Sequence, residues 1–266
     1  MIGVAMKDTH NITVPSVDEL KRTVLPGLIL DTKAISNYGD SAVSSCAMDR
    51  YSSLMEKNAV TELSGTLSGI VSALVQADPQ RIDSNPSWLS RFTGKHLETQ
   101  VRYQKARQEV ELLIDRGEYF LAHVNETLHA LDELLAIYQL EIRHLNIFIK
   151  AGREYLEDSS AEPMPEANRI AFDNPRERLA RKIANLATLL SSHEMTEMQL
   201  KMTRAQCIDM MDRFNETTKV LVPVWRQHTL SLNTTKNIDP SIVKQATNAH
   251  EALLSSLHKS LEGIAK

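Results

Sequence analysis

Two long stretches of this 266-residue chain contain almost no residue that ends a helix. Residues 95–151 include Gly117 as their only Gly or Pro, and residues 176–222 include neither. Because proline and glycine are the residues least compatible with a helix interior, such stretches permit very long helices. Aromatic residues make up only 5% of the chain. Packing therefore falls mainly to Leu, Ala, Met and Ile, which favours helices over sheets.

The first stretch carries apolar residues at helical spacing along its whole length. One row repeats at multiples of seven and comprises Tyr103, Val110, Val124, Leu131, Tyr138 and Leu145, with Gly117 also falling on it. A companion apolar row shifts by one position along the chain. On a nearly straight α-helix, an apolar row shifts in this way relative to the seven-residue repeat of a coiled coil. We therefore predict one helix over about 97–156, which at 1.5 Å per residue is roughly 90 Å long.

The second stretch begins with a strong helix-start signal, Asn174-Pro175-Arg176-Glu177. Asn can cap a helix, and Pro suits its first position. We predict a second long helix over about 175–222, with a kink or a stop at Pro223, which lacks the N–H that a helix needs. A further cap, Asp239-Pro240, predicts a last helix over about 240–264.

The predicted fold class is all-α. Residues 1–33 are expected to form a partly ordered N-terminal arm, and residues 34–266 a single elongated all-helical domain. Because a short linker joins the two long helices, we expect an elongated bundle built on a long antiparallel helical hairpin, with shorter helices covering it. Within residues 35–77, Gly65 and Gly69 indicate close packing against a neighbouring helix.

Composition narrows the classes of partner. The net charge is −4, with acidic and basic residues mixed along the chain, so nucleic acid is not expected. No stretch approaches the roughly 18 apolar residues of a transmembrane helix, although peripheral membrane contact stays open. Two distant cysteines favour a reduced cytoplasm, and the N-terminal sequence reaches Lys7, Asp8 and His10 too soon to form the apolar region of a signal peptide. No cofactor is expected.

Two Glu-x-x-His pairs are the strongest candidates for chemistry, Glu126/His129 and Glu141/His144. Di-iron bundles use such pairs, so a ferritin-like metal-dependent oxidoreductase is an alternative function. Both pairs fall on the same predicted helix, roughly 22 Å apart, and cannot share a metal within one chain. We favour a solvated helix face. The sequence from His193 to Glu197 begins like a zinc-protease motif, but its second His is replaced by Glu197.

Sulfur-containing residues offer two further alternatives. Met195, Met198 and Met202 have the spacing of a packing stripe or partner-binding surface, although thioethers with Cys207 could also select a soft metal. Cys46 and Cys207 could handle an oxyanion through thiol chemistry. Neither cysteine has an activating neighbour in sequence, which favours structural roles.

Five short motifs resemble those of the TelA family, proteins named for resistance to toxic anions such as tellurite. They are Ile35-Ser-Asn-Tyr-Gly39, Trp88-Leu-Ser-Arg-Phe-Thr-Gly94, Gln100-Val-Arg-Tyr-Gln104, Gln199-Leu-Lys-Met202 and Val222-Pro-Val-Trp225. The resemblance covers roughly residues 35–255. It implies a cytoplasmic helical protein linked to resistance against such oxyanions and to cell-envelope stress, without a defined enzymatic activity.

The resemblance also suggests binding residues, namely Gln199, Lys201, Pro223 and Trp225. Lys201 stands where the family usually has Arg, which keeps the charge but loses the bidentate fork. The chain is also shorter than typical members. Because the apolar rows are long and the sequence offers no catalytic constellation, we expect a non-enzymatic binding or assembly protein whose helical surfaces hold a protein partner or a second copy of the chain.

Overall fold

The computed structural model describes residues 15–31, 34–42, 59–76, 95–158 and 174–227, together with isolated helical positions at 248, 251–252 and 255. Within these residues every regular element is a helix, so the all-α prediction is confirmed there. The predicted bend at 78–94 and Cys46 lie outside the described residues. The predicted last helix at 240–264 lies almost entirely outside them too.

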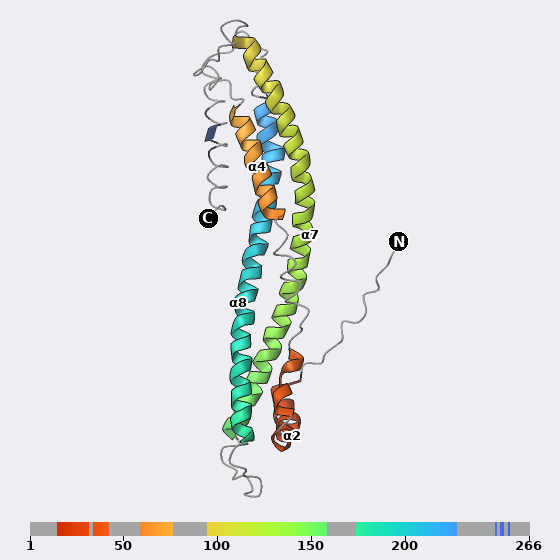
Figure 1. Cartoon of the computed structure of the whole chain (residues 1–266), viewed down its shortest axis with the longest axis vertical. Coiled ribbons are helices and arrows are strands. Elements are labelled where there is room, and N and C mark those ends of the chain that lie inside the picture. The colour runs from red at the N-terminus through yellow and green to blue at the C-terminus, as the bar shows by residue number, and fades with distance from the viewer. Residues whose placement is uncertain are drawn as a thin grey trace, which may run out of the picture. The chain divides into compact units, whose positions relative to one another are not determined.

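Two long helices dominate the described chain, α7 (Lys95–Asp158) and α8 (Pro175–Glu216). Both begin and end close to the predicted limits, and α7 continues through Gly117 without a break. The start of α8 is the predicted one, since the backbone N–H of Arg176 donates to the side-chain oxygen of Asn174 at 3.2 Å. Long helices with shorter ones packed against them therefore make up the fold (Figure 1).

The helical backbone does not stop at Pro223. A π-helical turn, η6 (Thr217–Leu221), follows α8, and helix resumes over 222–227. In this wider turn the N–H of Val222 donates to the carbonyl of Thr217, five residues back. Proline would clash with the carbonyl four residues before it in a regular helix, and a preceding π turn realigns those carbonyls. The sequence predicts either a kink or a stop of the helix at Pro223, and the stop does not occur.

The chain divides into two compact units. Unit 1 comprises Met1–Ser52 and Glu133–Lys201, and unit 2 comprises Ser53–Asp132 and Met202–Lys266. The single domain expected over residues 34–266 stays a prediction.

The long helices are antiparallel within each unit. In unit 1, Gly152 of α7 lies against Ile183 of α8, and Glu141 lies against His193 further along. In unit 2, Gly117 lies against Phe214, and Tyr103 stacks on Trp225, with 5.1 Å between ring centroids. In both units, a contact residue that comes later in the second long helical segment pairs with a residue that comes earlier in α7. The antiparallel pairing is therefore confirmed within each unit.

The described part of the N-terminal arm, residues 15–31, is largely helical. It forms α1 (Val17–Glu19), the π turn η1 (Leu20–Val24) and α2 (Leu25–Leu30), with the Ser16 side chain accepting from the Glu19 N–H. Leu20 and Leu25 are buried in the core of unit 1 with residues of α7 and α8. Burying these two leucines stabilises the arm against the long helices.

Two 3₁₀ turns follow the arm, η2 (Ala34–Asn37) and η3 (Asp40–Ala42). Between them the hydroxyl of Tyr38 donates to the carbonyl of Phe148 at 2.7 Å. Gly39 adopts φ +80°, where a Cβ would be strained and would also meet Leu186 at 2.7 Å. This turn places Ile35 and Ser36 beside α8.

Unit 2 contains α4 (Ala59–Gln76), whose buried face includes Leu63, Leu67, Ile70 and Leu74. A Cβ on Gly69 would lie 3.3 Å from the Leu113 side chain, whereas one on Gly65 would meet nothing within 4 Å. Close packing is thus confirmed for Gly69 and not for Gly65. None of the described helices holds an apolar stretch long enough to cross a bilayer.

Gly117 and Gly65 provide a matched test of the α7–α8 contact. A Cβ at position 117 would lie 2.2 Å from the buried Phe214 ring. Gly117→Ala should lower the free energy of unfolding by about 1–3 kcal/mol, because overpacking outweighs the gain in helix propensity. Gly65→Ala should raise it by about 0.5–1 kcal/mol. Denaturant unfolding measures both, and stabilisation by both substitutions would contradict the close contact.

Candidate functional site

A pocket of about 440 Å³ lies in unit 1 between α8 and the turn η2. It is lined by Ile35, Ser36, Arg178, Arg181, Lys182 and Asn185. Three of these six side chains are cationic and none is acidic. The four α8 residues recur at spacings of three and four, which places them on one face of the helix.

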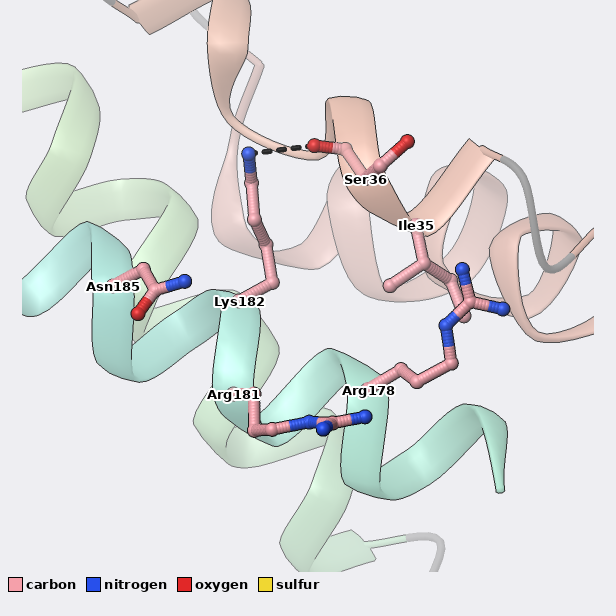
Figure 2. A pocket seen from close by; sticks show the side chains of 6 residues that line it. All are labelled: Ile35, Ser36, Arg178, Arg181, Lys182 and Asn185. Carbon is pink, nitrogen blue, oxygen red and sulfur yellow. Dashed lines mark hydrogen bonds between the residues drawn. The ribbon is translucent and has the colours of Figure 1, made fainter. Parts of the chain in front are cut away.

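Lys182 is held in place at the edge of this pocket. Its ammonium group donates to the backbone carbonyl of Ser36 at 2.6 Å (Figure 2). It also donates to the Asp40 carboxylate at 2.7 Å. These contacts connect α8 to both 3₁₀ turns. The pocket therefore has a fixed wall on one side and two arginines on the other.

A buried polar pair is the second notable feature of unit 1. Nε2 of His193 lies 2.9 Å from a carboxylate oxygen of Glu141, and both side chains are less than a tenth exposed. Nδ1 of His193 lies 3.1 Å from the carbonyl oxygen of Leu189. A carbonyl oxygen only accepts, so Nδ1 carries a proton. The contact between Nε2 and the Glu141 carboxylate completes this buried pair.

The two Glu-x-x-His pairs have different environments. Glu126 and His129 are exposed, as a solvated face predicts, whereas Glu141 and His144 are buried. The Glu141 carboxylate lies 2.9 Å from Nε2 of His193 on the other long helix. Burial, and then the charge of Arg143, lower the pKa of His144, while the nearby Glu141 carboxylate opposes this shift. In the described part of the chain, no three His, Cys, Asp or Glu side chains gather in a way that could hold a metal.

The first two residues suggested by the family resemblance, Gln199 and Lys201, lie on the exposed surface of α8. Lys201 pairs with Glu197 at 2.7 Å, and this contact lowers the pKa of Glu197. Met195, Met198 and Met202, on the same helix, are 64%, 65% and 60% exposed. Of the two packing roles left open for these methionines, the structure supports a surface and not a core.

The other two suggested residues, Pro223 and Trp225, lie in unit 2. Pro223 is exposed, while the Trp225 ring is almost fully buried against Tyr103. The buried ring contributes to the core of unit 2.

Cys207 is also buried in unit 2, and burial raises the pKa of its thiol. The thiolate is the reactive form of cysteine, so this environment disfavours reaction at neutral pH. Cys207 does not share the exposed face of the three methionines.

Sequence reasoning missed the basic pocket and the partner of Glu141. In the sequence, the cationic residues near the start of α8 have the pattern of an ordinary solvated helix face: Arg178, Arg181 and Lys182. They line a pocket because residues 35–40 lie beside this part of α8. His193 was considered only within a failed metal motif. The position of His193 on the apolar face of α8 could have indicated a polar partner, because a buried histidine needs one for its ring nitrogens.

Comparison with known proteins gives two findings. The family described as "Toxic anion resistance protein (TelA)" matches residues 27–252. The chain is also 48% identical over 245 residues to Protein KlaA of Escherichia coli, an alignment that covers 92% of this chain and 95% of KlaA. No solved structure matches.

The buried and exposed glutamates test the Glu141–His193 pair. Glu141→Ala should lower the free energy of unfolding by about 1–3 kcal/mol, because it leaves a buried imidazole nitrogen without its partner. Glu126→Ala removes the same group from an exposed Glu-x-x-His pair and should change stability by less than about 0.5 kcal/mol. Equal effects in urea unfolding would show that the buried pair does not stabilise unit 1.

Proposed function

Because the chain belongs to the toxic anion resistance (TelA) family, we propose that it acts in resistance as a non-enzymatic binding protein of the cytoplasm. In this proposal the long helices hold a partner protein, and the assembly protects against anions such as tellurite and supports the cell under envelope stress. The partner contributes an amphipathic helix whose apolar face lies along α8.

The exposed methionines of α8 carry this proposal. Met195, Met198 and Met202 follow one another at spacings of three and four on a continuous helix, so they share one face. Each is at least 60% exposed. Contiguous exposed apolar surface is typical of interaction sites, and flexible, polarisable methionines adapt to the shape of a partner.

Gln199 belongs to the same face. It is four residues from Met195 and three from Met202, so helical geometry places it among the methionines. A polar amide inside an apolar row favours one orientation of the partner over others, because it breaks the uniformity of the apolar surface. This placement gives a physical role to the residue that the family resemblance suggested. Lys201 and Glu197 form an ion pair that borders the row.

The environment of Cys207 supports binding over thiol chemistry. Its thiol is buried, and the raised pKa leaves little thiolate at neutral pH. Glu141 and His193 satisfy each other in the interior of unit 1, which fits a structural role. The methionine thioethers are therefore better exposed than the Cys207 thiol and the Glu141–His193 pair.

A triple substitution tests the methionine surface. Met195→Gln, Met198→Gln and Met202→Gln together keep side-chain length while removing apolar surface. Because all three side chains are exposed, the free energy of unfolding should change by less than about 0.5 kcal/mol per substitution. We expect affinity capture from the protein's own cells, with crosslinking and mass spectrometry, to lose specific partners.

Leu112→Gln is the matched control, since Leu112 is 71% exposed but lies on α7. It should retain every partner that the wild type captures. If the triple variant captures the same proteins as the wild type, the methionine surface is not the binding site. Sedimentation of the purified proteins separates loss of a partner from loss of self-association.

A further inference from the structure

Exposure divides the methionines of α8 into two groups. Met195, Met198 and Met202 are 64%, 65% and 60% exposed, whereas Met210 is fully buried and Met211 is partly buried. Within the described residues, every methionine belongs to this one continuous helix. The difference between the two groups therefore comes from the helix face on which each side chain lies. Only the first group offers its sulfur atoms to small molecules in the solvent.

The exposed thioethers are the sulfur groups of α8 that a dissolved oxidant reaches first. A thioether needs no ionisation before it reacts, whereas cysteine reacts as its thiolate. Cys207 is fully buried, and burial raises the pKa of its thiol. Exposure and ionisation both protect this cysteine, and neither protects the three exposed methionines. Oxidation of α8 by a peroxide is thus expected to begin on the methionine surface.

Oxidation by hydrogen peroxide changes the polarity of a methionine without breaking the chain. The thioether sulfur attacks one peroxide oxygen with its lone pair, so that an S–O bond forms and the O–O bond breaks. The sulfur loses two electrons and becomes a sulfoxide, while the other oxygen takes up a proton and leaves as water. The sulfoxide is polar where the thioether was apolar. An apolar partner face can then cover it only at the cost of its hydrogen bonds to water.

We propose that Met195, Met198 and Met202 form an oxidation-sensitive modification site that switches off partner binding when peroxides accumulate. The inference rests on the proposed function, because the switch needs a bound partner to release. Up to three sulfoxides would lie within about two turns of one helix, which interrupts the whole apolar row. A bound partner helix covers the same sulfur atoms, so the partner and the oxidant compete for them. Methionine sulfoxide reductases, with a thiol as reductant, can restore the thioethers.

The order of oxidation is the first test. The purified full chain is treated with hydrogen peroxide for increasing times, and peptide mapping by mass spectrometry measures the oxygen gained by each methionine. We expect the three exposed methionines to react at least about tenfold faster than Met210, because susceptibility follows exposure. Circular dichroism identifies the times at which the helical content is unchanged. Equal rates for Met210 and the exposed methionines at those times would overturn the inference.

The effect on binding is the second test, and the triple variant Met195→Leu/Met198→Leu/Met202→Leu is its matched control. Leucine keeps the apolar surface but has no sulfur to oxidise. Both proteins are treated with peroxide, the peroxide is destroyed with catalase, and each protein is used for affinity capture with crosslinking from the protein's own cells. We expect treated wild type to capture its specific partners about tenfold less than untreated wild type, whereas the leucine variant retains them. Methionine sulfoxide reductase with dithiothreitol should restore capture by the wild type.

The untreated triple glutamine variant distinguishes failure of this inference from failure of the proposed function. If that variant captures the same proteins as untreated wild type, the methionine surface binds no partner and both proposals fail. If it loses partners that peroxide-treated wild type retains, only the oxidation switch is overturned. The switch is also overturned if peroxide removes the partners of the leucine variant, because the oxidation responsible then lies elsewhere in the chain.

Discussion

The antiparallel packing of α7 against α8 is the interaction on which each unit depends. At Gly152 in unit 1 and Gly117 in unit 2, the missing Cβ admits a large side chain of α8, Ile183 or Phe214. Such contacts set the pairing of the two helices, because a shift along either one would drive a side chain into backbone. Shorter elements then pack on this pair, as Gly39 does against Leu186 and Gly69 against Leu113.

The same packing positions the buried polar pair and the exposed features of α8. It brings Glu141 to His193 in the interior, where each satisfies the other. On the outside of α8 it leaves the methionine row exposed, and near the start of the helix it lets the turns at residues 34–42 close over Arg178, Arg181 and Lys182. One helix thus contributes a buried face, an apolar surface and a cationic pocket.

Much of this fold could be predicted from the sequence, because helix signals are local. The absence of breakers and the row from Tyr103 to Leu145 located α7, and Asn174 located the start of α8. Contacts between elements were harder to predict. Glu141 has a histidine three residues away, but its partner is 52 residues away, and no local pattern distinguishes the two. The pocket depends in the same way on residues more than 140 apart.

Membership of the TelA family connects the chain to toxic anion resistance, and we propose that the chain acts there by binding rather than by turnover. The most direct test is to incubate purified protein with a large excess of tellurite and cellular reductants, glutathione and NADH, and to quantify the tellurite that remains. The account predicts no loss beyond that seen with heat-unfolded protein, apart from stoichiometric binding. Consumption of many equivalents of tellurite per chain would contradict it.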